Sequence, residues 1–72
     1  MHFEDIIKII KARRESLKVT QEILAELSGV GLRTLKQFES GKGNPTLMTL
    51  QKLGDALGLE ISISIKNRTT NS

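Results

Sequence analysis

Hydrophobic residues recur at helical spacing over most of the chain, and near the C-terminal end the period changes to two. A first stripe predicts an amphipathic helix over about residues 3–16. Its positions are Phe3, Ile6, Ile7, Ile10, Arg14 and Leu17. A later stripe predicts a helix that begins near residue 46 and ends near residue 57. Its core positions are Leu47, Leu50, Leu53 and Leu57.

Between these stripes, residues 21–38, QEILAELSGVGLRTLKQF, have the spacing of a helix-turn-helix. Two helices that cross steeply need a small residue where they meet, and Ala25 is the fifth residue of the stretch. The turn needs a residue that tolerates positive φ, and Gly29 is the ninth. Apolar residues at the fourth, tenth, fifteenth and eighteenth positions fill the space beneath the crossing: Leu24, Val30, Leu35 and Phe38.

Local signals mark where the predicted helices begin and end. Thr20 and Thr46 each precede a predicted helix, where a threonine hydroxyl can accept a hydrogen bond from a free backbone N–H. Gly58 follows the last helix at the position that favours left-handed backbone. Gly54 lies inside that helix, where glycine costs about 1 kcal/mol relative to alanine. We interpret Gly54 as the site of a close backbone contact; the alternative is a tolerated flaw.

After Gly58 the period of two predicts a β-strand. Its apolar positions, Leu59, Ile61, Ile63 and Ile65, alternate with Glu60, Ser62, Ser64 and Lys66. A lone strand cannot satisfy its own backbone groups, so we expect it to pair antiparallel with the same strand of a second copy about a two-fold axis. Residues 1–66 then form one helix-turn-helix domain with a dimerisation strand. The polar residues 67–72, NRTTNS, are expected to be disordered.

Composition narrows the class of protein. The chain has 72 residues and no cysteine, so we expect one small domain without disulfides. The net charge of +3 comes from residues 31–72, which hold six basic and three acidic side chains, whereas residues 1–30 hold five of each. No apolar run approaches the roughly 18 residues of a membrane span, and no signal peptide is visible, so we expect a cytoplasmic protein. No catalytic residue, metal or cofactor is expected, because the body of the chain has no cysteine, histidine or phosphate-cradling loop.

With these elements placed, residues 17–58 resemble the phage-repressor/Cro-like (XRE) helix-turn-helix family. The Thr20-Gln21 pair, the Glu39-x-Gly41 ending and the NPTLxTLxKL stretch lie where the family has them. The resemblance covers about residues 6–59 and implies a mainly α, lambda-repressor-like domain of four to five helices. EISISIK replaces the usual fifth helix. This arrangement resembles the HipB-type antitoxins of bacterial toxin–antitoxin operons, in which a terminal strand pairs across the dimer.

The resemblance implies a sequence-specific transcriptional regulator whose second motif helix lies in the major groove of double-stranded DNA. The positions that match base-contacting residues are Leu32, Arg33, Lys36 and Gln37. Gln21 matches a phosphate-contacting position, and the further candidates for phosphate contacts are Thr34, Lys42 and Asn44. Arg14 and Glu39 match an ion pair with a structural role, which ties the first helix to the recognition helix. A homodimer would read a palindromic operator and be associated with the nucleoid when bound to it.

Two departures from the family pattern bear on function. Gly31 stands where the recognition helix normally opens with Ser or Thr, so one phosphate-binding hydroxyl is absent. Ile23 and Leu27 stand where polar residues are common. We favour the interpretation that these two extend the core; the alternative is an exposed apolar patch for a partner protein.

The resemblance to HipB-type proteins predicts an autorepressor that is also the antitoxin of a HipBA-type operon and binds a toxin kinase. The alternative is a plain XRE-family regulator without a toxin partner.

Overall fold

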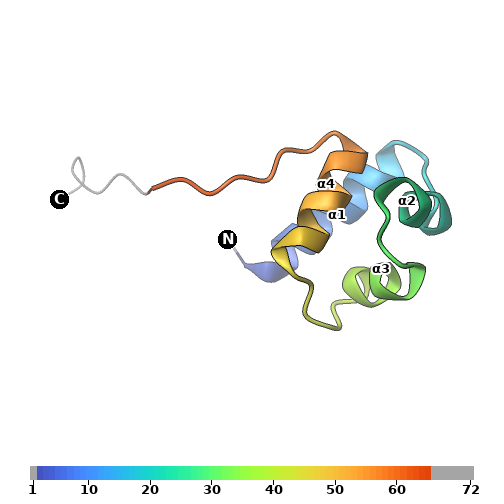
Figure 1. The fold of residues 1–72 in the computed structure, drawn as a ribbon, viewed down its shortest axis with the longest axis horizontal. Helices are drawn as coiled ribbons and strands as arrows, with labels where there is room; N and C mark the ends of the chain where they lie inside the picture. Colours follow the sequence, from blue (N-terminus) through green and yellow to red (C-terminus); the bar gives the residue numbers. More distant parts are fainter. Residues whose placement is uncertain (1, 66–72) are drawn as a thin grey trace.

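The computed structural model describes residues 2–65 and contains four α-helices. They are α1 (Phe3–Ser16), α2 (Gln21–Ser28), α3 (Leu32–Glu39) and α4 (Leu47–Leu57), followed by an extended segment, residues 59–65, which we call the arm (Figure 1). The prediction of a mainly α fold is confirmed, with four helices. The predicted disordered tail, residues 67–72, lies outside the described residues, as does Lys66. In the part of the chain that the structure describes, no helix is both long enough and apolar enough to cross a membrane.

Threonine side chains fix the first turns of two helices. The Thr20 hydroxyl accepts a hydrogen bond from the Ile23 N–H at 3.1 Å, at the start of α2. The Thr46 hydroxyl accepts one from the Thr49 N–H at 3.1 Å, at the start of α4. Each bond satisfies a backbone donor that has no partner inside the helix, and both predicted caps are therefore confirmed.

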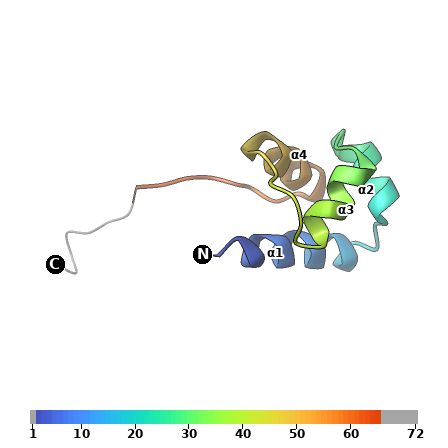
Figure 2. The same ribbon diagram turned by 90° about the horizontal axis from the view of Figure 1, so that it is seen from below.

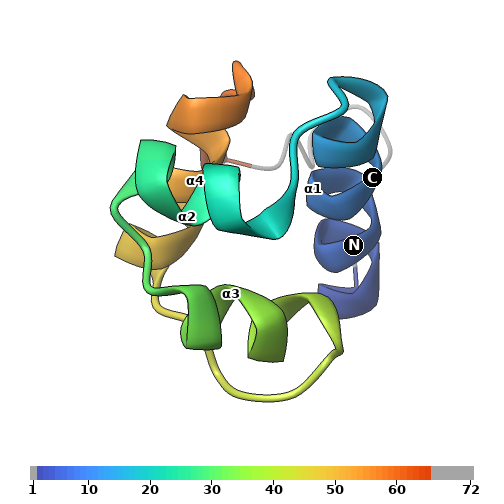
Figure 3. The ribbon, with the colours of Figure 1, turned by 90° about the vertical axis from the view of Figure 1, so that its right-hand side faces the viewer.

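The turn between α2 and α3 depends on Gly29, whose φ of 78° lies in the left-handed region. A side chain there would be strained, so glycine is the residue that allows α3 to leave α2 at a steep angle. Ala25, one turn earlier, is half-buried against the core and is small enough for the two helices to approach each other. Figure 3 shows α2 crossing between α3 and α4, and α2 contacts both of them.

One cluster of buried apolar side chains holds the helices together. Its members are Ile7, Ile10, Leu24, Val30, Leu35, Phe38, Leu53 and Leu57. All four motif positions predicted to lie beneath the helix crossing belong to this core. The ring of Phe3 meets the ring of Phe38 edge-on, with centroids 6.3 Å apart, which extends the core toward the start of α1.

Three apolar residues assigned to the core from helical spacing are exposed instead. Leu47 is 57% exposed, because no described residue fills the groove that it lines with α1. Ile23 is 49% exposed and Leu27 is 63% exposed, so the interpretation that we favoured for this pair is wrong. Their spacing does place them together, but α2 reaches the core through Leu24 and turns this pair toward the surface.

The arm is extended but does not form a β-strand, because residues 2–65 include no partner strand for it. It turns back at Gly58, runs between α1 and α4 toward the first turn of α4, and then leaves the helical body (Figures 1 and 2). Ile63 is 85% exposed and Ile65 is 96% exposed. The strand expected here is therefore not formed within residues 2–65, and its pairing across a dimer stays a prediction.

Gly54 allows the arm to lie directly on α4. A Cβ at this buried position would lie 3.1 Å from Cδ1 of Ile61 and 3.2 Å from the carbonyl oxygen of Leu59. The Leu59 N–H donates a hydrogen bond to the Gly54 carbonyl at 2.8 Å, which holds the first residue of the arm against the helix. The predicted close backbone contact at Gly54 is therefore confirmed.

We expect Gly54→Ala to lower the free energy of unfolding by about 1–3 kcal/mol, the usual effect of overpacking a core. Alanine is the better helix former by about 1 kcal/mol. However, the Leu59 carbonyl belongs to the backbone, and it cannot move aside without disturbing the hydrogen bond between these two residues. Urea unfolding followed by circular dichroism measures the change, and Gln51→Ala, at an exposed position of α4, is the control. A Gly54→Ala variant more stable than the parent would contradict this account.

Candidate nucleic-acid interface

The outer side of α3 is a polar face with long side chains. Leu35 and Phe38 bury the inner side of the helix in the core. Arg33, Lys36 and Gln37 lie three and four residues apart, so they share one face, and all three are exposed. Figure 3 shows α3 at one edge of the molecule, with none of the other described helices over its outer side. The inner side of α3 is therefore packed in the core, and its outer side is exposed.

The first turn of α3 has a positive electrostatic character. Gly31 precedes it and provides no capping side chain, and the turn contains no acidic residue. The partial positive charge of the helix N-terminus is therefore not neutralised by the helix itself. Leu32 is half-buried in this turn, and Thr34 is exposed.

A small cleft on one side of α3, with a volume of about 140 Å³, joins the helix to the loop that follows it. Its lining includes Thr34, Gln37, Lys42, Gly43 and Asn44. The Lys42 N–H donates to the Gln37 carbonyl at 2.9 Å, and a Cβ at Gly43 would lie 3.7 Å from the Gln37 Cβ. The fold thus brings one residue predicted to contact bases together with three predicted to contact phosphates.

A wider cleft of about 310 Å³ lies on the other side of α3. It brings Gln21 of α2 beside Lys36 of α3, and Lys11 and Ser40 share its lining. Sequence reasoning missed Lys11 and Ser40. The packing of α1 on α3 brings Lys11 to this cleft. The signal that could have identified it is its place one turn before Arg14, the residue of α1 that the family resemblance already linked to α3.

Glu39 lies at the base of this wider cleft and joins three helices. Nε of Arg14 donates to its Oε2 at 2.7 Å, and Nη2 of Arg14 donates to its Oε1 at 2.9 Å. Nε2 of Gln21 donates to the same Oε1 at 3.0 Å. Nη1 of Arg14 also donates to the Val19 carbonyl at 2.8 Å. The structure therefore contains an ion pair that ties α1 to α3, with an amide from α2 bound to it.

The ion pair is almost completely removed from water. The Arg14 side chain is 11% exposed and the Glu39 side chain is 3% exposed. The hydrogen bonding of Arg14 to the Glu39 carboxylate raises the pKa of Arg14, and this outweighs the opposing effect of burial. Gln21 has two amide N–H donors, and the bond to Glu39 uses one of them. The second donor is not used by any hydrogen bond within the described residues, and Gln21 lines the wider cleft.

The fold and this face define the class: α2 and α3 form a helix-turn-helix whose second helix presents basic and amide side chains. The helix-turn-helix family model HTH_3 matches residues 10–63, which is most of the chain. The chain therefore belongs to the XRE-type helix-turn-helix family of transcriptional regulators.

Several curated proteins are similar to this chain. The cryptic phage CTXphi transcriptional repressor RstR of Vibrio cholerae is 43% identical over 51 residues, covering 71% of this chain and 44% of the repressor. The immunity repressor protein of Bacillus phage phi105 is 37% identical over 60 residues, covering 83% of this chain and 42% of that protein. An uncharacterized HTH-type transcriptional regulator of Methanothermobacter thermautotrophicus is 38% identical over 52 residues, covering 72% of this chain and 75% of the regulator. The chain thus spans less than half the length of the two phage repressors.

We expect Glu39→Gln to destabilise the fold by about 3–5 kcal/mol, because Arg14 would remain buried without its counter-charge. The matched control is the double variant Arg14→Met with Glu39→Leu, which removes both charges and is expected to recover most of the loss. Urea unfolding of the parent, the single variant and the double variant measures the three free energies. The account fails if Glu39→Gln is as stable as the parent.

Proposed function

We propose that the chain is a sequence-specific DNA-binding regulator that inserts α3 into the major groove. The observation that carries this proposal is the outer side of α3, where Arg33, Lys36 and Gln37 are exposed on a helix whose inner side is buried. Because the inner side of α3 is already packed in the core, the helix can enter the major groove without any rearrangement of the core. The clefts on both sides of α3 support the proposal, because their basic and amide groups are of the kind that binds phosphates.

Four residues of α3 are proposed to read base edges. Arg33 and Lys36 can donate to O6 and N7 of guanine, and Gln37 can form a bidentate pair with adenine. Leu32, in the first turn, can contact a thymine methyl group. The N-terminal position of Leu32 and Arg33 in the helix supports their part, since recognition helices enter the groove by this end.

Residues in the two clefts are proposed to contact the phosphate backbone. Gln21 keeps one amide N–H beyond the bond to Glu39 and would donate it to a phosphate oxygen. From the smaller cleft, Thr34, Lys42 and Asn44 would also donate hydrogen bonds to phosphate oxygens. We add Lys11, because it shares the wider cleft with Gln21. These contacts position the protein on the duplex and carry no sequence information.

The DNA-binding unit is proposed to be a two-fold dimer formed through the arm. Leu59, Ile61, Ile63 and Ile65 would form the apolar face of an antiparallel pair of strands. Two recognition helices related by this axis would read a palindromic operator with half-sites about one helical turn apart. The exposure of Ile63 and Ile65 in the single chain supports this proposal, because pairing would cover them.

The regulator is proposed to repress its own operon and to be an antitoxin of the HipBA type that binds a toxin kinase. Similarity to two phage repressors supports repression. The arm, which follows four helices in the place of a fifth, supports the antitoxin role, as do the exposed Ile23 and Leu27. The alternative is a plain XRE-family regulator without a toxin partner, and a kinase-like gene beside this one would favour the first role.

We expect the protein to protect a palindrome in its own promoter, with Arg33, Gln37 and Gln21 contributing in different ways. Arg33→Ala or Gln37→Ala should weaken operator binding by about 1–3 kcal/mol and relax preference at one base pair in each half-site. Gln21→Ala should weaken operator and random DNA by similar factors, because a phosphate contact is independent of sequence. Gel shifts on the operator and on operators with single base-pair changes measure these effects.

Footprinting of the promoter at several salt concentrations provides the control for this prediction. Each phosphate neutralised by a lysine or arginine should add roughly 0.9 to the slope of log affinity against log salt, so Lys42→Ala should reduce the slope by about that amount, whereas Gln21→Ala, which removes no charge, should leave the slope unchanged. The absence of a protected palindrome would count against autorepression. Equal losses on specific and random DNA for all three variants would show that Arg33 and Gln37 do not read bases.

We expect the double variant Ile23→Ser with Leu27→Ser to stay folded and bind DNA but to lose the toxin. Both side chains are exposed, so serine leaves no cavity in the core. Burying each of them in an interface would contribute about 1.5–3 kcal/mol. Co-purification with the product of an adjacent kinase-like gene measures toxin binding, and thermal unfolding and gel shift test the fold and the DNA face. A variant that keeps both ligands would exclude this patch as the toxin site.

A further inference from the structure

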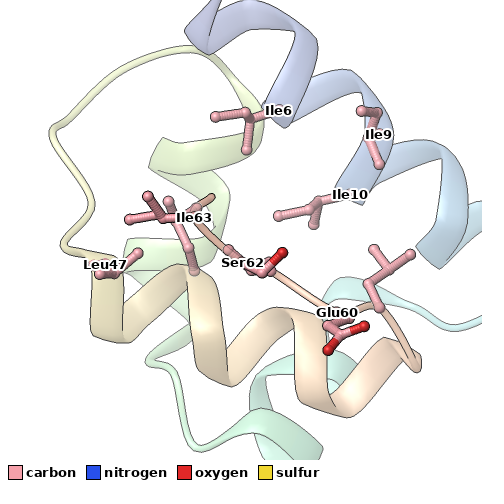
Figure 4. A pocket seen from close by; sticks show the side chains of 10 residues that line it. Ile6, Ile9, Ile10, Leu47, Glu60, Ser62 and Ile63 are labelled. Carbon is pink, nitrogen blue, oxygen red and sulfur yellow. The ribbon is translucent and has the colours of Figure 1, made fainter. Parts of the chain in front are cut away.

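A groove between α1, α4 and the arm is open in the single chain. Its volume is about 410 Å³. Ile6, Ile9 and Ile10 of α1 form one wall, Leu47 and Leu50 of α4 form another, and the arm forms a third (Figure 4). Every side chain that the two helices contribute is aliphatic. Ile9 is 46% exposed and Leu47 is 57% exposed, so the groove leaves apolar surface uncovered.

The arm is fixed at its root and free at its tip. At the root, Leu59 and Ile61 are half-buried against α4, where the missing side chain of Gly54 makes room for them. At the tip, Ile63 and Ile65 are almost fully exposed. Alternate residues of an extended segment point to the same side, so the three isoleucines of the arm share one face. The tip therefore presents an apolar surface that its own body does not cover.

We propose that each groove receives the tip of the arm of a second copy, with Ile65 of that copy against the isoleucines of α1. This inference rests on the proposed two-fold dimer and specifies where its arms go. Two arms that pair antiparallel place each tip beside the root of the other. Residues 59–63 of the arm border the groove, so the tip of the second arm, lying beside the root, would reach it. The tip of each arm would then cover the groove of the other copy, so the same contact would form twice, as a two-fold interface requires.

The lining of the groove fits an aliphatic side chain better than a small polar effector. Sites for small molecules combine apolar walls with a few polar groups that fix the orientation of the ligand. Here the polar side chains of the lining are Glu60 and Ser62, and both belong to the arm itself. The chain's own arm cannot be the occupant, because it already forms a wall of the groove and its tip leads away from the body (Figure 1).

Cross-linking tests this arrangement directly, because the natural chain has no cysteine. Copies carrying Ile9→Cys are mixed with copies carrying Ile65→Cys and treated with a short bismaleimide. We expect a cross-link between the two kinds of copy. Copies carrying Leu27→Cys, an exposed position on α2, are the matched control and should not cross-link to Ile65→Cys. No cross-link with either partner, or equal cross-linking with both, overturns the proposal.

Sedimentation of the same proteins shows whether the dimer itself forms, and so distinguishes a failure of the groove contact from a failure of the proposed dimer. A dimer that does not cross-link through Ile9 overturns the groove as the seat of the arm and leaves the dimer itself standing. A monomer at micromolar concentration overturns both. DNA binding by α3 is measured independently by gel shift on the operator, so a monomer that still binds the operator would overturn the dimer and retain the DNA-binding function.

A second pair of variants tests the walls of the groove without changing the arm. Ile9→Ser with Leu47→Ser should raise the dissociation constant of the dimer about ten-fold or more, since it removes apolar surface that the tip would cover. Ile23→Ser with Leu27→Ser, also at exposed positions, should leave it unchanged. An unchanged dissociation constant for the groove variant overturns the proposal. Native mass spectrometry that finds a monomer with a small molecule bound would also overturn it.

Discussion

The orientation of α3 depends on the buried ion pair between Arg14 and Glu39. Removing both charges from water is unfavourable, and it is offset only when the geometry is good and the remaining polar atoms have partners. Here the guanidinium makes two bonds to the carboxylate and one to the Val19 carbonyl, and Gln21 donates to the carboxylate as well. The apolar core determines which side of α3 faces inward. The directional bonds to Glu39 limit how far the helix can rotate about its own axis, and this rotation decides where Arg33 points.

The same ion pair also determines the charge of the surface around α3. Glu39 is the one acidic residue of this helix, and its charge is matched internally by Arg14. Arg33 and Lys36 therefore remain as exposed charges without a counter-charge in their own helix. A residue that would weaken the attraction of α3 for an anion is thus used to hold the helix in place. The ion pair between Arg14 and Glu39 therefore both orients α3 and leaves Arg33 and Lys36 as its unmatched charges.

The parts of the fold that depend on local chemistry could be predicted from the sequence. A residue and its immediate neighbours were enough to predict four features: the caps at Thr20 and Thr46, the left-handed Gly29 and the close contact at Gly54. Helical spacing placed Leu24, Leu35 and Phe38 in the core correctly, but it cannot show whether another part of the molecule covers a face. Leu47 was therefore assigned to the core and is exposed. The candidate site shows the same limit, because Lys11 reaches the wider cleft only through the packing of α1 against α3.

The anchored root of the arm links the groove between α1 and α4 to the exposed face of α3. Gly54 holds Leu59 and Ile61 against α4, so the direction in which the arm leaves is set by the same helices that position α3. In the proposed dimer, that direction determines the two-fold axis and therefore the distance between the two recognition helices. A flexible connection at the root would let this distance vary, and each half-site would then be bound almost independently. In that dimer, a fixed root would make the half-site spacing of the operator a property of the fold, set in part by Gly54, which lies outside α3.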